Sequence, residues 1–348
     1  MLRNTALSVA LICAGPALAE APNVMTDIPP VHSIVSAIME GVGTPDIIVD
    51  RQTSVHNMQL KPSQMRGLQE TDLLIWVGPT LSPWMEKPVA SAVGEGKSMV
   101  LADVEGVIRL EGHDHDHDHG EEDHAEDEHA DHEGHDDHAD HEGHDDHKDD
   151  AASYDPHLWL SPDNAIVWVQ AITGKLIEID PENAETYAAN ALEFASGLAL
   201  MSLAHATELN DYPHFTYIVG HDALGYLEAF YDRRSIAQIV PTDGSAASVA
   251  RVQMLQGLIA ERKISCVLQD YETPDKIVAQ LVAGEDIPVR RIDPLGQSLE
   301  FGPDLYMAVM TDLHQAMLDC AQATPAAAHD DDHKEEDHDH DDHDDHDH

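Results

Sequence analysis

The sequence predicts an α/β protein of two lobes, each with a mainly parallel sheet flanked by helices, joined by a long connecting helix. Short apolar runs alternate with stretches of helical periodicity in residues 23–103 and again in 215–320, the pattern of parallel strands with crossover helices. Residues 181–211 read as one long helix between these halves. A chain of 348 residues, 42% of them hydrophobic, has the length of about two domains.

The first half shows this alternation clearly. VHSIVSAIMEGVG, from Val31, has apolar residues at helical spacing and ends on glycines, and IIVD (47–50) is a short strand. Pro62 opens a helix in KPSQMRGLQETD. The apolar run DLLIWVG (72–78) is typical of a buried parallel strand, and MVLAD (99–103) is expected to be the next one.

The second half repeats the pattern. A helix begins at Pro162, with Ser161 as its N-cap, and the long helix follows it. Four further helices are expected. One begins at about Asp222, one is VARVQMLQGLIAERK, one begins at Pro274, and the last ends near Cys320. The predicted strands between them cover 215–220, 235–240, 264–270 and 289–293.

These elements define the expected domains. Residues 1–19 are assigned to a signal peptide, 20–180 to an N-terminal lobe, 181–211 to the connecting helix, 212–322 to a C-terminal lobe, and 323–348 to a disordered His/Asp-rich tail.

The amino terminus has the features of a cleaved secretion signal. Arg3 opens a short basic stretch, an apolar run covers 6–13, and Ala17-Leu18-Ala19 is a small-residue cleavage site. The run is too short to anchor the chain permanently, and no later segment is apolar over about 18 residues. A soluble periplasmic protein without membrane insertion is therefore expected.

The formal net charge of −49 excludes two classes of partner. Nucleic acids and anionic membranes are bound through clustered Lys and Arg, and this chain has 18 basic against 67 acidic residues. Cations are the natural ligands.

A low-complexity segment, residues 113–150, consists almost entirely of histidine and acidic residues and contains DHEGHDDHA followed by DHEGHDDHK. It has no apolar residue larger than alanine, so it cannot bury enough surface to offset its ordering entropy. We expect a disordered insertion, with a second such tract at 329–348. Such a segment either offers many weak metal sites or serves as a solubilising acidic linker. The representative weak sites are His113, His115, His117, His119, His135, His138, His144 and His147.

Two cysteines, Cys266 and Cys320, follow the signal segment. Thiols of exported proteins tend to be oxidised, so a disulfide between them is expected. It would close a loop of about 54 residues and contribute on the order of 3 to 4 kcal/mol. The alternative is two buried free thiols.

Four side chains outside the histidine-rich tracts are candidate metal ligands. His221 directly follows a predicted strand and Asp293 ends another, which places both at strand carboxyl ends, where open α/β sheets bind ligands. His56 lies in a polar loop, and His157 lies between two prolines. Three imidazoles and one carboxylate on stiff loops suit a tetrahedral Zn²⁺ site. His32, at the start of the first helix, is expected to be a capping or surface residue, with the cleft as the alternative. No partner pattern marks the other three as ligands: His205, His214 and His314.

Four segments at these positions carry a family resemblance. LKPSQMRGLQETDLLIWVGP, HLWLSP, GHDALGYLEAF and RIDPLG closely resemble segments of the solute-binding proteins of zinc-uptake ABC transporters, the ZnuA type. The resemblance covers essentially the whole mature chain, including an acidic histidine-rich insertion. It implies that the histidines matching His56, His157 and His221 bind zinc, and the two cysteines match a family disulfide.

The fourth ligand varies in that family. It is a carboxylate matching Asp293 in some members, and water or a glutamate beside the first histidine in others. Here that neighbour is Val55, which cannot coordinate, so Asp293 or water is expected. The family often has His-Asp where this chain has His56-Asn57. Related manganese-binding proteins carry a glutamate in place of His221, so three nitrogens favour zinc.

The resemblance implies a non-enzymatic carrier that captures zinc and delivers it to the membrane permease of an ABC transporter. The histidine-rich tracts are expected to collect zinc near the site, and the protein is expected to be a monomer. Two other functions stay open. One is a periplasmic zinc buffer or chaperone without a permease. The other is a zinc hydrolase, because three histidines with an open position can activate water, although no HExxH motif is present.

Overall fold

The computed structural model describes residues 21–49, 51, 54–56, 58–111, 154–240, 247–262 and 264–323. The predicted signal peptide, the insertion with its weak metal sites and the tail beyond residue 323 lie outside the described residues.

The described chain divides into two compact units. The first contains the described residues up to Val107, Asp163–Ser202 and Leu295–Val309. The second contains the described residues of Ile108–Pro162, Leu203–Pro294 and those from Met310 onward. The limits expected from the sequence, 20–180 and 212–322, remain predictions.

The first unit is built on a parallel sheet in the order β2-β1-β3-β4. Its strands are β1 (Val24–Thr26), β2 (Asp46–Ile47), β3 (Leu73–Trp76) and β4 (Ser98–Val100). The helices of this part of the chain are α1 (Pro29–Ile38), α2 (Pro62–Glu70), α3 (Glu86–Ala92) and α4 (Pro162–Ile179). One core cluster packs Leu68 of α2 against Met25, Leu74 and Trp76 of the sheet, so the apolar face of α2 covers this sheet.

The ends of the two central strands of the first sheet are tied by a buried carboxylate. Asp27, directly after β1, accepts the backbone N–H of Val77 at 2.8 Å and that of Ile28 at 2.9 Å. Burial raises the pKa of Asp27 to about 7, although these backbone hydrogen bonds act to lower it.

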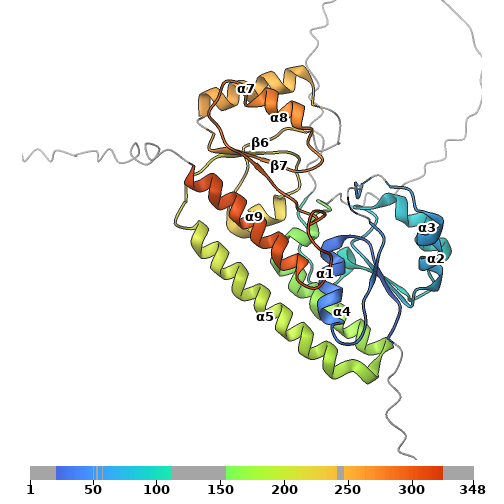
Figure 1. Cartoon of the computed structure of the whole chain (residues 1–348). Helices are drawn as coiled ribbons and strands as arrows, with labels where there is room; N and C mark the ends of the chain where they lie inside the picture. The colour runs from blue at the N-terminus through green and yellow to red at the C-terminus, as the bar shows by residue number, and fades with distance from the viewer. Residues whose placement is uncertain are drawn as a thin grey trace, which may run out of the picture. The chain divides into compact units, whose positions relative to one another are not determined.

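The second unit repeats the same architecture. Its parallel sheet has the order β6-β5-β7-β8, with β5 (Tyr217–Val219), β6 (Ala237–Gln238), β7 (Cys266–Gln269) and β8 (Val289–Arg291). Helices α6 (Gly225–Tyr231), α7 (Val249–Arg262) and α8 (Asp275–Leu281) connect the strands. Figure 1 shows α7 and α8 over the sheet, and Leu255, Ile259 and Val278 of these helices join Ile218 and Val267 of the strands in one core cluster.

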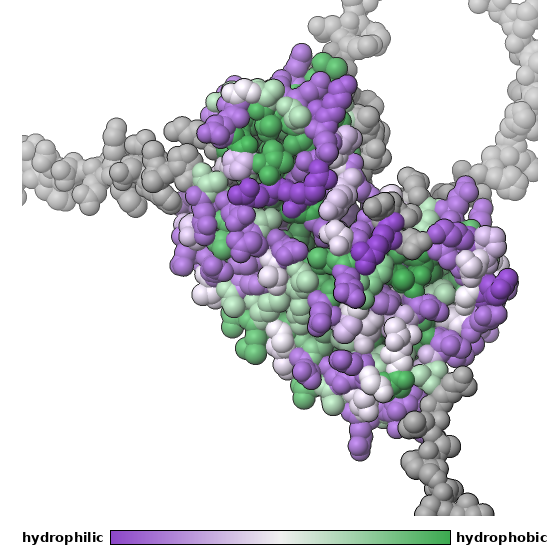
Figure 2. Space-filling model, viewed as in Figure 1, coloured by the Kyte–Doolittle hydropathy of each residue, from purple (hydrophilic) through white to green (hydrophobic). Residues whose placement is uncertain are grey.

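Two long helices contribute residues to both units. The predicted connecting helix is α5 (Ala184–Leu209), 26 residues preceded by a short 3-10 turn, and the last is α9 (Leu305–Gln322). Figure 2 shows apolar residues gathered along α5, where Leu192, Leu200 and Leu203 are largely exposed. The helix is therefore apolar on more than one side, and its length and alanine content, rather than an apolar stripe, reveal it in the sequence.

The fold class predicted from the sequence is confirmed, whereas several details differ. The strand expected at 99–103 ends at Val100, and Leu101–Asp103 forms a 3-10 turn. The helix expected from Asp222 begins at Gly225, because the Ala223 N–H bonds the His221 carbonyl oxygen in a turn. Strand β1 and helix α3 were not anticipated.

The expected disulfide joins Cys266 of β7 to Cys320 of α9, with Cα atoms 5.3 Å apart. Both cysteines are fully buried. The bond links the sheet of the second unit to its last helix. Within the described residues, no helix combines the length and apolarity needed to cross a bilayer.

Candidate metal centre

His221 lies where the second sheet changes its winding direction. Strands β5 and β7 are neighbours, and chain segments run from them to opposite sides of the sheet. The carboxyl ends of such a strand pair are the usual ligand position of an open α/β sheet. His221 follows β5 by two residues and Asp270 directly follows β7.

Asp270 holds the His221 ring in one orientation. Its Oδ2 lies 2.8 Å from His221 Nδ1 and 3.1 Å from the His221 backbone nitrogen. Because a carboxylate only accepts, Nδ1 carries the proton, which leaves the Nε2 lone pair for a metal. Burial alone would raise the Asp270 pKa, but hydrogen bonds from His221 and Thr273 lower it to about 2. Burial acts to lower the pKa of His221, but the hydrogen bond and charge of Asp270 raise it overall.

His157 is held by the same arrangement within a single turn. Oδ1 of Asp155 lies 2.7 Å from His157 Nδ1 and accepts the His157 backbone N–H at 2.9 Å. The histidine is buried and its ring packs edge-on against Trp159, with centroids 5.3 Å apart. Its Nε2 is therefore also the nitrogen left for a metal.

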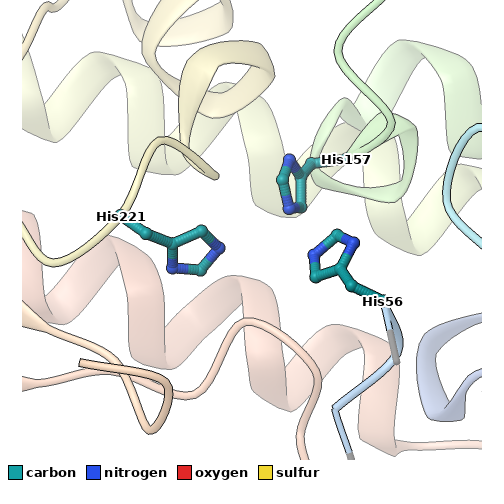
Figure 3. Close-up of side chains that lie close together, drawn as sticks. All are labelled: His56, His157 and His221. Carbon is teal, nitrogen blue, oxygen red and sulfur yellow. The ribbon is translucent and has the colours of Figure 1, made fainter. Parts of the chain in front are cut away.

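The two imidazoles lie next to each other in the second unit. Their ring centroids are 5.4 Å apart and the rings are inclined at 62° (Figure 3). Both rings are fixed through Nδ1, so the second unit offers two neighbouring imidazole nitrogens, a ligand type that suits Zn²⁺.

His56 belongs to the first unit, in the loop that leads from β2 to α2. It is half-buried, and its backbone N–H bonds the Ser54 hydroxyl at 3.4 Å. A hydrogen bond also holds the backbone of this loop, because Trp84 Nε1 donates to the Val55 carbonyl oxygen at 2.8 Å. Val55, the residue before His56, is 2% exposed, so its side chain lies in the core.

Asp293 follows β8 and is half-buried. Its neighbour Pro294 accepts a 2.8 Å hydrogen bond from Trp159 Nε1, which ties this loop to the segment of His157. Among the described residues, the group of potential ligand atoms that includes His157 and His221 does not include Asp293. Its role as a ligand remains a prediction.

A short bridge closes the chain on either side of the histidine-rich insertion. Glu111 and Tyr154 form an isolated antiparallel bridge, and the Asp155 N–H bonds the Leu110 carbonyl oxygen at 3.0 Å. The Tyr226 hydroxyl accepts the Leu110 N–H at 3.0 Å and donates to the Asp155 carbonyl oxygen at 2.9 Å. The insertion therefore returns to the folded unit three residues before His157.

The carboxylates that orient the histidines were not singled out from the sequence. Asp155 has a local signal, because Asp-Pro-His places an acceptor two residues before the imidazole. Asp270 lies 49 residues from His221, and only the pairing of β5 with β7 brings the two together.

The remaining described histidines make other contacts. The expectation of a capping or surface residue is wrong for His32, which is buried and whose Nε2 bonds the Pro45 carbonyl oxygen at 3.1 Å. His205 and His314 stack in the second unit with centroids 4.0 Å apart. Glu208 bonds His314 Nε2 at 2.9 Å, whereas Nδ1 of both rings is buried without a hydrogen-bond partner. His214 is exposed.

Comparison with known proteins gives one family. Residues 24–320 match the family model ZnuA, described as "Zinc-uptake complex component A periplasmic". The protein named high-affinity zinc uptake system protein ZnuA of Paracoccus denitrificans (strain Pd 1222) is 38% identical over 329 residues, which cover 93% of this chain and 100% of the relative.

Solved structures agree on the fold. A crystal structure of ZnuA superimposes with a TM-score of 0.69 at 22% identity and covers 88% of this chain and 100% of its own. A zinc-bound crystal structure of a ZnuA deletion mutant gives a TM-score of 0.67 at 19% identity, with 88% and 99% covered. The two-sheet architecture is thus shared with these proteins.

Proposed function

Because this chain belongs to the ZnuA family of zinc-uptake components, we propose that it captures zinc in the periplasm and delivers it to the permease of an ABC transporter. The observation that carries the proposal is the pair of imidazoles on His157 and His221, each held at Nδ1 by a carboxylate. Such orientation lowers the cost of ordering ligands and selects the tautomer that binds metal. Such pre-oriented ligands are expected of a site that binds zinc tightly when little zinc is present.

His56 supplies the third nitrogen in this proposal. The family resemblance assigns it this role, because its segment matches the one that carries a zinc-binding histidine in ZnuA-type proteins. Three neutral imidazoles favour zinc over harder cations such as Mn²⁺. The fourth position is assigned from the sequence to Asp293 or water.

The insertion at 113–150 and the tail at 329–348 collect zinc for this site. The bridge between Glu111 and Tyr154 supports the role of the insertion, because it brings the returning chain to His157 within three residues. Alternating histidine and aspartate offer weak sites that exchange readily, and these pass zinc to the stronger one. The chain is exported through cleavage of residues 1–19 and acts as a monomer.

Zinc titration of the full mature chain tests the site. The wild-type protein is expected to retain one tightly bound zinc ion against a competing chelator, and to bind further zinc ions weakly on the histidine-rich tracts. His56→Ala, His157→Ala and His221→Ala are each expected to lose the tight ion, whereas the control His214→Ala, at an exposed histidine, retains it. Tight binding that survives loss of both His157 and His221 refutes the assignment.

Growth experiments in cells distinguish a transport function from a buffering function. A strain that lacks the protein is expected to stop growing in chelator and to recover with added zinc alone. Deletion of the permease should produce the same defect in the presence of the protein. Growth that depends on the protein but not on any permease would identify a buffer instead.

A further inference from the structure

We infer that Glu272 is a ligand of the bound zinc and fills the fourth position in place of Asp293 or water. Its Oε2 lies 4.0 Å from Nε2 of His221, the ring nitrogen that the Asp270 hydrogen bond leaves for the metal. The inference rests on the proposed zinc site and assigns it a further residue.

The loop after β7 is built to present this side chain. Asp270 Oδ1 accepts the backbone N–H of Glu272 at 2.8 Å, that of Thr273 at 2.9 Å and the Thr273 hydroxyl at 3.0 Å. Its other oxygen holds His221. One carboxylate thus fixes both the imidazole and the backbone from which the Glu272 side chain extends.

The distance suits a shared ion after a small side-chain movement. Zinc binds imidazole nitrogen and carboxylate oxygen at about 2.1 Å, so two such ligands at a tetrahedral angle lie about 3.4 Å apart. Closing the observed 4.0 Å requires a shift of about 0.6 Å. The Glu272 side chain is 36% exposed, so rotation of its outer bonds achieves this without moving the backbone.

Charge also favours Glu272 over water. The carboxylates of Asp155 and Asp270 contact the imidazoles on the side away from the metal, so a carboxylate bound to the ion itself offsets its charge more directly than water does. Asp293 lies before a proline whose carbonyl oxygen is held by Trp159. Neither Asp293 nor Glu272 belongs to the group of described potential ligands that includes His157 and His221, and the 4.0 Å contact with His221 Nε2 is what favours Glu272.

The test compares Glu272→Gln with Glu285→Gln, a matched change at an exposed position in the turn after α8. Glutamine keeps the size of the side chain and the backbone hydrogen bond to Asp270, so thermal unfolding without metal should match wild type. Chelator competition should show zinc bound at least about tenfold more weakly by Glu272→Gln and unchanged by Glu285→Gln. The cobalt(II)-loaded protein reports coordination through its visible absorption, which should change in Glu272→Gln.

Equal zinc affinity in wild type and Glu272→Gln overturns the inference. So does weaker binding with an unchanged cobalt spectrum, because a nearby charge that does not coordinate gives that result. Asp293→Asn is expected to retain affinity and spectrum, and loss of both in that variant alone assigns the position to Asp293. If wild type itself fails to bind one tight zinc, the proposed function fails rather than this assignment.

Discussion

The Asp270 carboxylate contacts His221 at two points, the ring Nδ1 at 2.8 Å and the backbone nitrogen at 3.1 Å. Replacing it by asparagine removes the charge that orients the imidazole. Zinc affinity of Asp270→Asn is expected to fall by about 10- to 100-fold, the usual effect of losing a carboxylate behind a metal-binding histidine. Chelator competition measures it. The exposed Asp286→Asn serves as control, and an affinity equal to wild type in both would contradict the role of Asp270.

Gly220 is required by the close approach of the loop after β7. A Cβ at this position would overlap Thr273 Oγ1 and Asp270 Oδ2. Gly220→Ala is expected to displace Asp270 from His221, to weaken zinc binding at least tenfold, and to destabilise the fold by about 1 to 3 kcal/mol. Denaturant unfolding and zinc competition measure the two effects.

The control for this variant is Gly257→Ala in α7, where a Cβ would meet nothing within 4 Å. Alanine in a helix interior is favoured over glycine by about 1 kcal/mol, so this variant should be slightly more stable and bind zinc as wild type does. Similar behaviour of the two alanine variants would refute the steric argument.

The disulfide between Cys266 and Cys320 should carry a large share of the stability. It joins residues 54 apart in sequence. In the chain-entropy model its loss costs about 4 kcal/mol. The midpoint of guanidinium unfolding should therefore shift to lower denaturant when reductant is present. A double variant with alanine at both positions should not respond to reductant, and an unresponsive wild type would contradict the prediction.

His205 should make the fold less stable in acid. Burial, together with the charge of the stacked His314, lowers the pKa of His205 to about 4. Between about pH 4 and 6.5 the unfolded chain binds a proton that the folded chain does not, so stability falls as the pH drops through this window.

His205→Phe keeps a stacked ring and removes the buried Nδ1 that has no partner. Its unfolding free energy should fall less than that of wild type between pH 6.5 and 4.5. Denaturant titrations at several pH values measure the difference. His214→Gln, at an exposed histidine, should follow the wild-type curve, and a parallel curve for His205→Phe would remove His205 as the cause.

Much of the fold follows from local pattern. The runs LLIW and CVLQ became the inner strands β3 and β7 because every residue in them is buried. Strand β1 was not found, because VMT stands between Asn23 and Asp27 without a longer apolar run, and its pairing with β2 and β3 defines it. Only part of the candidate site could likewise be predicted from the sequence. His221 is marked by its place after a strand, whereas Asp270 and Glu272 become its neighbours only through strand order.

The bridge between Glu111 and Tyr154 has a practical consequence for protein engineering. Because the two stems meet in the folded unit, long flexible peptides can connect them, and the entropic cost rises by only about 0.6 kcal/mol for each doubling of loop length. The position therefore suits the grafting of a foreign module, such as a fluorescent reporter. A module placed there would stand three residues from His157 and leave both sheets intact.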